Sequence, residues 1–305
     1  MMLVYTLWVL VTLLVIGTGT ARDTHLSVVE ERRALDMMTL RAAAISGVEA
    51  SRAVLAKHTN SSFAHLMEPF RTEPELCMFT IDEETWVLCY HVVANDGAEA
   101  WELALGPSDE ESRINLLESE PWLLARLPGV TKGMAQQLTA YMERNPTFRP
   151  MTLRDLVEIP GWQIADYEDL EPLLTFHGTG KVNVNTASSR IFELLGASRQ
   201  AIDDMMSYLA GPNGARGDAD DRFFSSVSDI IPELQESGAS VTAVREWTHL
   251  VRTDLVGVAS HHYRVRVRAV RGWSDEQFEV SAVLRIDDEI SKVEWWEERP
   301  PKQGG

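Results

Sequence analysis

The residues best suited to chemistry in this sequence are three aspartates of one loop, Asp218, Asp220 and Asp221. They follow a glycine-rich stretch, 211–217, so three carboxylates fall within four positions of a flexible loop. Carboxylate oxygens at this density suit calcium, which prefers hard oxygen ligands, although the spacing is not that of an EF-hand. Two interpretations therefore stay open, a calcium site and an ordinary solvated acidic loop.

The two cysteines, Cys77 and Cys89, are a second candidate. Stretches rich in β-branched and aromatic residues, 76–81 and 85–94, flank a short acidic turn and predict a β-hairpin. The hairpin places both thiols on neighbouring strands and near each other. A disulfide is one prediction, if this part lies outside the cytoplasm, and two buried free thiols are the other.

No enzyme motif occurs in the sequence. The eight histidines are scattered without metalloprotease spacing, and neither a nucleophile elbow nor a phosphate-binding loop is present. The net charge of -18 argues against a nucleic-acid partner, because lysine and arginine must neutralise the phosphates. The sequence therefore predicts a protein that is not an enzyme and works through its surfaces.

A long N-terminal helix is the first element that must position these residues. Residues 1–21 carry no charge and are long enough for one helical crossing of a bilayer. No basic residue precedes Arg22, which favours a retained transmembrane segment over a cleaved signal peptide. The helix continues over residues 22–66 with an apolar stripe at helical spacing. We predict that this stripe packs on a sheet and on partner helices: Met37, Leu40, Ala44 and Val48.

Strand patterns flank a block of helical patterns in the rest of the chain. From Tyr263 to Leu284 apolar and polar residues alternate, which predicts strands with one buried face. A helical block between strands of one sheet indicates an insertion. The predicted segments are the first part of the sheet (67–112), the inserted α-helical domain (113–252), the C-terminal strands (253–286) and a poorly ordered tail (287–305).

Two related repeats are predicted inside the helical block, at residues 113–165 and 181–236. Each starts with an extended pair of apolar residues around an asparagine, Ile114-Asn-Leu and Val182-Asn-Val, and continues into a helix. An asparagine side chain in such a position hydrogen-bonds nearby backbone and fixes a turn. The repeats therefore predict a duplicated supersecondary unit.

Several of these segments match one family in their order. Residues 109–116 read Asp-Glu-Glu-Ser-Arg-Ile-Asn-Leu, where the family pattern is Asp-Glu-x-Gly-x-Ile-Asn-Leu-Asn. The apolar N-terminal helix precedes this segment, and Val182-Asn-Val-Asn-Thr-Ala and Tyr263-Arg-Val-Arg-Val-Arg follow it. Over nearly its whole length the chain resembles the K-class minor pseudopilins of type II secretion (the GspK family).

The resemblance implies an α+β, pilin-like fold, with a long N-terminal helix on a small antiparallel sheet and a large all-α domain inserted between strands. It implies a single-pass protein of the bacterial inner membrane with its bulk in the periplasm, at the tip of the pseudopilus. The implied partners are the I- and J-class minor pseudopilins, the major pseudopilin and the secreted substrates. Some K-class members bind calcium in the inserted domain, which favours the calcium interpretation of the aspartate loop.

The sequence departs from the family at its start. Pseudopilins carry a short basic leader before the apolar helix, whereas this sequence begins Met1-Met2-Leu3, so we expect either a truncated start or different processing. Most pilins also have a glutamate near the start of the helix, and here no acid precedes Asp23. An unpaired carboxylate in a membrane is costly, so its absence fits a tip subunit with no neighbour above it.

The repeats carry a second resemblance. Leu127-Pro-Gly-Val and the helical run after it are similar to a helix-hairpin-helix unit, whose Gly-x-Gly turn binds a DNA phosphate. Thr131 stands at the second glycine position, and the turn at 196–198 also lacks it. The alternative function is therefore a membrane-anchored, competence-type DNA-binding protein, which the acidic charge disfavours.

Overall fold

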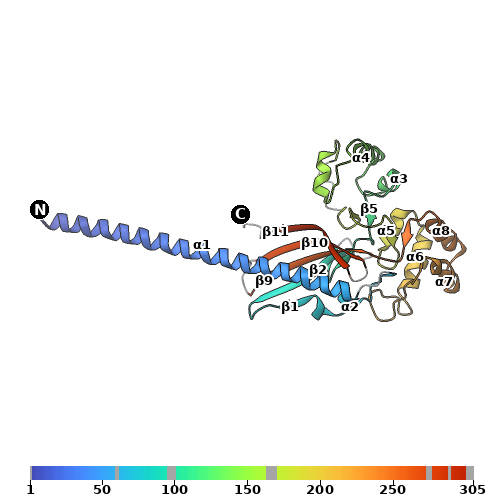
Figure 1. Cartoon of the computed structure of the whole chain (residues 1–305), viewed down its shortest axis with the longest axis horizontal. Coiled ribbons are helices and arrows are strands. Elements are labelled where there is room, and N and C mark those ends of the chain that lie inside the picture. The colour runs from blue at the N-terminus through green and yellow to red at the C-terminus, as the bar shows by residue number, and fades with distance from the viewer. Residues whose placement is uncertain are drawn as a thin grey trace.

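The computed structural model describes residues 2–58, 62–94, 101–162, 170–272, 277–287 and 290–299. Its longest element is helix α1 (Met2–His58), whose C-terminal half lies along a sheet while its N-terminal half projects away from the rest of the chain (Figure 1). The helix ends at His58, before the predicted boundary at residue 66. Among the residues described, no helix has the length and apolarity of a membrane-spanning segment.

The sheet is antiparallel and runs in the order β1-β2-β9-β10-β11, with β3 on β2 and β4 on β9. Because β2 and β4 both pair with β9, strands from before and after the helical segment are direct neighbours. The strands are β1 (Met78–Thr80), β2 (Thr85–Ala94), β3 (Trp101–Leu105), β4 (Ser108–Asp109), β9 (His262–Arg271), β10 (Gln277–Asp287) and β11 (Ile290–Arg299).

The apolar stripe of α1 contacts this sheet. Leu40, Ala44 and Val48 are fully buried in one core with residues of β2, β9 and β10, and Met37 packs at its margin. At Gly47 a side chain would have no room, because a Cβ there would lie 2.6 Å from methyl carbons on β2 and β9. The chain's own sheet covers this stripe, so a partner helix would have to contact other residues of α1.

The tail is the clearest difference from the sequence prediction. We expected residues 287–305 to be poorly ordered, but β11 pairs with β10 through most of its length. The prediction is wrong for residues 290–299, where backbone pairing with β10 and the partly buried Trp296 hold a charged strand at the sheet edge. Residues 288–289 and 300–305 lie outside the described residues.

The segment between β4 and β9 is mostly helical but not all-α. It contains two short parallel strand pairs, β5 (Ile114–Asn115) with β6 (Leu174–Thr175) and β7 (Val182–Asn183) with β8 (Val256–Gly257). Its helices are α3 (Pro121–Leu124), α4 (Lys132–Arg144), η2 (Leu153–Glu158), α5 (Ser189–Leu195), α6 (Arg199–Leu209), η4 (Val227–Asp229), α7 (Ile230–Glu236) and α8 (Val241–Arg252).

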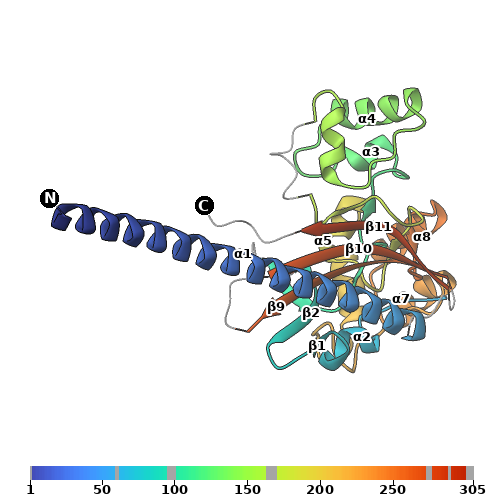
Figure 2. The same ribbon diagram turned by 60° about the vertical axis from the view of Figure 1, so that its left-hand side comes forward.

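The two parts of this segment repeat one order of elements. In each, a two-residue strand is followed by two helices and a 3₁₀ turn, and the strand pairs in parallel with a strand at the end of the unit. The second unit adds α7 and α8 before its last strand. Two views show α3 and α4 as one group and α5 to α8 as another (Figures 1 and 2). Buried apolar residues between Ile114 and Val258 form a core separate from that of α1 and the sheet.

Candidate functional site at the junction of sheet and helical segment

Glu110 follows β4 and is fully buried between two arginines. Arg264 of β9 donates from Nε to Oε1 over 2.9 Å and from Nη2 to Oε2 over 3.0 Å, and Arg113 donates from Nη1 to Oε1 over 3.1 Å. The hydroxyl of Thr175 on β6 donates to Oε2. Burial alone would raise the pKa of Glu110, but the two guanidinium charges hold it well below its usual range. Glu110 thus ties β9 to β6 as a carboxylate.

Asp109 is the neighbouring buried acid and binds the second repeat. Its Oδ2 accepts from the hydroxyl of Ser260 over 2.6 Å, from the amide of Asn183 over 3.2 Å and from the hydroxyl of Thr186. Its Oδ1 accepts from the backbone N–H of Glu111 over 2.8 Å. Burial, together with the charge of Glu111, raises the pKa of Asp109 to about 6. Asp109 is therefore surrounded by neutral hydrogen-bond donors, whereas Glu110 is surrounded by arginines.

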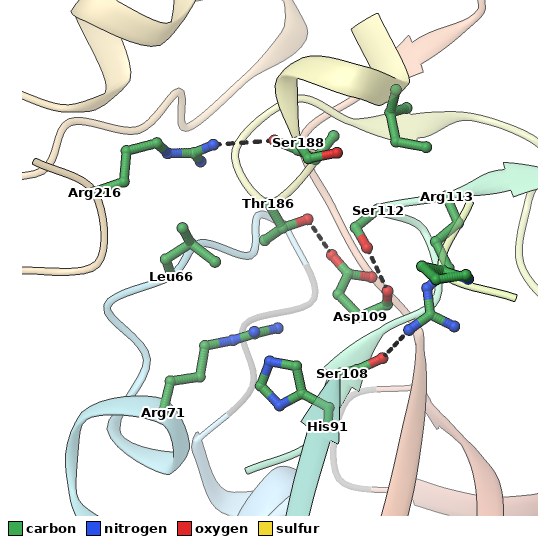
Figure 3. Close-up of a pocket in the computed structure, with 13 residues that line it drawn as sticks. Leu66, Arg71, His91, Ser108, Asp109, Ser112, Arg113, Thr186, Ser188 and Arg216 are labelled. Atoms are coloured by element: carbon green, nitrogen blue, oxygen red, sulfur yellow. Dashed lines mark hydrogen bonds between the residues drawn. The ribbon is translucent and has the colours of Figure 1, made fainter. Parts of the chain in front are cut away.

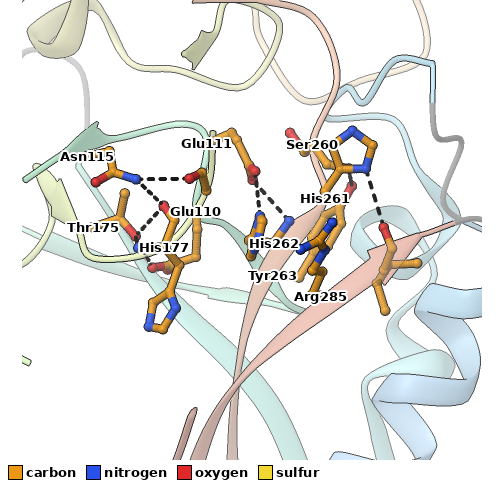
Figure 4. Close-up of polar contacts among 12 residues, drawn as sticks. Glu110, Glu111, Asn115, Thr175, His177, Ser260, His261, His262, Tyr263 and Arg285 are labelled. Carbon is orange, nitrogen blue, oxygen red and sulfur yellow. Dashed lines mark hydrogen bonds and ion pairs between the residues drawn. The ribbon is translucent and has the colours of Figure 1, made fainter. Parts of the chain in front are cut away.

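Glu111 turns toward His262 (Figure 4). It accepts from the backbone N–H of His262 over 3.1 Å, and its Oε1 lies 2.8 Å from the Nδ1 of the same residue. Burial lowers the pKa of His262, but the hydrogen bond to Glu111 and its charge outweigh this and the pKa is raised. Glu294 of β11 lies 3.4 Å from the other ring nitrogen and 3.6 Å from Nδ1 of His177.

Asn115 fixes the first repeat's turn, as the sequence predicted. Its Oδ1 accepts from the backbone N–H groups of Leu117 and Glu118, over 2.9 and 3.2 Å. Its Nδ2 donates to the carbonyls of His177 and Gly178, over 3.0 and 3.2 Å. The side chain therefore holds both its own turn and the strand that pairs with it.

Asn183 and Asn185 fix the corresponding turn of the second repeat and also contact residues distant in the sequence. The Oδ1 of Asn183 accepts from the N–H of Asn185 over 3.0 Å, while its Nδ2 donates to Ser260 Oγ over 2.8 Å and to the carbonyl of Ala64 over 3.2 Å. Asn185 exchanges two hydrogen bonds of 2.9 Å with the backbone of Phe224. The segment Asp109–Glu111 and the two asparagine turns therefore form one buried polar joint between the sheet and the helical segment.

The predicted calcium ligands lie in a different place from this joint. The amide of Asn213 donates to Asp218 over 2.7 Å and to Asp220 over 2.6 Å, and Asp221 accepts from the N–H of Gly217 over 2.7 Å. A cation between the first two carboxylates would have to displace that amide. No group of three or more acidic, histidine or cysteine side chains suited to holding a metal occurs in the described part of the chain. Calcium at this loop stays a prediction.

The two cysteines are free thiols on adjoining backbone segments. The N–H of Cys89 donates to the carbonyl of Cys77 over 2.7 Å, and the thiol of Cys77 donates to the carbonyl of Phe70 over 2.9 Å. Burial raises the pKa of Cys77 to about 11 and that of Cys89 to about 12. Both are therefore neutral thiols at pH 7, which corresponds to the second of the two interpretations left open.

The helix-hairpin-helix turns have structural partners. Thr131 caps α4, its hydroxyl accepting from the N–H three residues on over 3.2 Å. Arg126 of the first repeat donates to the last carbonyls of α5, Glu193 over 3.4 Å and Leu194 over 3.2 Å. Its Nη1 lies 2.7 Å from where a Cβ on Gly196 would be. The turn of the second hairpin is thus covered by the first repeat.

The burial of the joint is not predicted by the sequence. Residues 109–111 match a family pattern, but acids in a chain of charge -18 are normally solvated. A signal was available in the alternating arginines of β9, one of which, Arg264, turns out to be the main partner of Glu110.

These elements define a pilin-like α+β protein, in which a long N-terminal helix packs on an antiparallel sheet. No family model matches the sequence, and no curated protein matches it either. Among solved structures the chain is similar to a chain of the GspK-GspI-GspJ complex from the type 2 secretion system of enterotoxigenic Escherichia coli. The TM-score is 0.58 at 13% sequence identity, over 89% of this chain and 100% of that chain. The fold is therefore similar to that of the type II secretion minor pseudopilins, which are typically not enzymes.

Proposed function

We propose that this chain is a K-class minor pseudopilin of a bacterial type II secretion system. It would cap the tip of the pseudopilus and help to initiate assembly for the export of folded proteins. The observation that carries the proposal is the pilin-like arrangement of α1 on the sheet, which matches the whole length of a chain from a GspK-GspI-GspJ complex. The K class is favoured by the large, mostly helical segment between β4 and β9 and by the motif at residues 109–116.

The proposed partners are the I- and J-class minor pseudopilins, with the major pseudopilin below them and secreted substrates in contact with the tip. The projecting half of α1 supports this, because its apolar side chains are exposed and unpartnered by the rest of the chain. We propose that they contact the inner membrane before assembly and partner helices afterwards, with the bulk of the chain in the periplasm. Examples are Tyr5, Leu7, Trp8, Leu10, Leu14 and Ile16.

The buried joint gives this function a physical basis. A tip subunit that presents a bulky helical segment must hold it at a fixed angle to the helix that enters the filament. Glu110 binds both β9 and β6, Glu111 binds β9, and Asp109 binds Asn183 of β7, so the sheet and the helical segment are fixed at several points. Calcium at the aspartate loop is a further part of the proposal and would stiffen the second repeat.

A secretion assay tests the proposal. Deleting the gene in its own bacterium should leave type II substrates in the periplasm, and a plasmid copy should restore export. A matched plasmid copy with Arg222→Gln, at an exposed position outside the joint, should restore export equally. Normal export from the deletion strain would contradict the proposal, and retardation of duplex DNA at moderate salt would favour the DNA-binding alternative.

A further inference from the structure

A cavity of about 280 Å³ lies beside the joint, bordered by the turn around α2 (Pro69–Thr72), by β4 and by the start of α5 (Figure 3). Its volume is several times that of a single water. Arg71 reaches into it from the α2 side, and Arg113 borders it from the joint. A third arginine, Arg216, also lines it and donates to the backbone carbonyls of Ala187 and Asn185. Other lining side chains include Leu66, His91, Ser108, Asp109, Thr186 and Ile191.

Arg71 is a buried cation without hydrogen-bond partners for two of its nitrogens. Its side chain is 10% exposed, and Nε and Nη2 bond to nothing among the described residues. The nearest carboxylate oxygen, on Glu68, is 3.7 Å from Nε, longer than a hydrogen bond. Burial raises the pKa of Glu68 to about 8, so near pH 7 most of this carboxyl is neutral. A buried guanidinium left in this state is costly, and an anion would relieve the cost.

The other polar groups of the cavity are already engaged. Arg113 donates to Glu110 and, over 2.7 Å, to the hydroxyl of Ser108, whose own hydrogen remains available to a ligand. The Nδ1 of His91 lies 2.8 Å from a backbone carbonyl, and burial lowers the pKa of this ring to about 3, so it is neutral. Asp109 is held by its own donors and adds negative charge to one wall.

We propose that this cavity binds one short aliphatic carboxylate. Nε and Nη2 form the side of a guanidinium that can donate two parallel hydrogen bonds to the oxygens of a carboxylate. These are the two nitrogens of Arg71 without partners among the described residues. The aliphatic chain would lie against Leu66 and Ile191. A doubly charged phosphate fits less well, because Glu110 compensates Arg113, Arg216 is bonded to backbone carbonyls, and the carboxylate of Asp109 borders the same space.

The test is a titration of the full-length chain, in non-ionic detergent at pH 7, with ¹³C-labelled propionate followed by NMR. Saturable binding of one equivalent is expected, and propanol, which has the same chain without the charge, should not compete. Arg71→Gln should weaken binding about tenfold or more, because it removes the paired donors. The matched control Arg222→Gln, an exposed arginine against Tyr208, should bind like the unmodified chain.

A second variant separates loss of the site from loss of the fold. Leu66→Glu places a carboxylate of the chain itself in the cavity that Arg71 lines, so it should abolish propionate binding while leaving the circular dichroism spectrum unchanged. Unsaturable binding to the unmodified chain, equal binding by Arg71→Gln, or tighter binding of inorganic phosphate would each overturn the proposal. None of these outcomes depends on the secretion function.

Discussion

Two buried carboxylates near the joint, Glu110 and Glu68, have opposite surroundings. Glu110 accepts from two arginines and a hydroxyl, and these donors hold its pKa below the usual range although it is fully buried. Both oxygens of Glu68 are buried without a hydrogen bond in the described part of the chain, and burial raises its pKa to about 8. Burial alone therefore does not decide the charge of a carboxyl, because donors within hydrogen-bond distance can reverse its effect.

The two carboxyls therefore have different roles: Glu110 joins parts of the chain to one another, whereas Glu68 lies beside an arginine that borders a cavity. At Glu110 the carboxylate and the two guanidinium charges compensate one another. This group therefore has a structural role and links β9, β6 and the turn after β4. At Glu68 the neighbouring Arg71 lies 3.7 Å away without a hydrogen bond, and it borders a cavity. The first region supplies the rigidity that the proposed tip function requires, and the second forms the proposed ligand site.

The largest effect should follow from Glu110→Gln. It removes the charge that compensates Arg264 and Arg113, and breaking a buried pair in this way typically costs about 3–5 kcal/mol of unfolding free energy. Urea unfolding measures it. The matched control is Glu171→Gln, because the half-exposed Glu171 pairs with Arg266 of the same strand, and it should cost less than about 1 kcal/mol. Equal losses of unfolding free energy in the two variants would contradict the structural role given to Glu110.

A smaller effect of opposite sign is expected for Glu68. A carboxyl with a folded pKa above its unfolded value binds more protons when folded, so stability falls as pH rises from about 4.5 to about 8. Glu68→Gln should therefore be more stable than the unmodified chain at pH 8 and should show a shallower pH slope. The gain should be smaller than the loss at Glu110, because the variant also removes the carboxyl beside Arg71. Asp109, whose pKa is raised to about 6, contributes part of the same slope and should keep it from vanishing. Urea unfolding at pH 5 and pH 8 measures both, and a variant less stable at pH 8 would contradict this account.

In the aspartate loop the side-chain amide of Asn213 lies between the carboxylates of Asp218 and Asp220 and donates to both. If calcium displaces Asn213, saturating millimolar calcium should raise the melting temperature by a few degrees, about 1–2 kcal/mol of linkage. Chelation should reverse the rise, and Asp220→Asn should remove it. An unchanged melting temperature in millimolar calcium would exclude this site.

Much of the fold could be predicted from periodicity. The stripe Leu40–Ala44–Val48 and the alternation along β9 each record burial by a single neighbouring element, which local sequence encodes. The joint could not be predicted in this way, because Glu110 and Arg264 lie 154 residues apart and only the fold brings them together. The asparagine turns were predictable because their first hydrogen bonds are local, whereas their contacts to Phe224 and Ala64 were not.

The central claim, that this chain is a pseudopilus tip subunit, is tested most directly by co-purification. The full-length chain would be co-expressed with the I- and J-class minor pseudopilins of the same genome, extracted in detergent, and its mass measured by light scattering. We expect a stable stoichiometric complex of the three chains, retained by Arg71→Gln and weakened by Glu110→Gln. A folded chain that remains monomeric in the presence of both folded partners would contradict the claim.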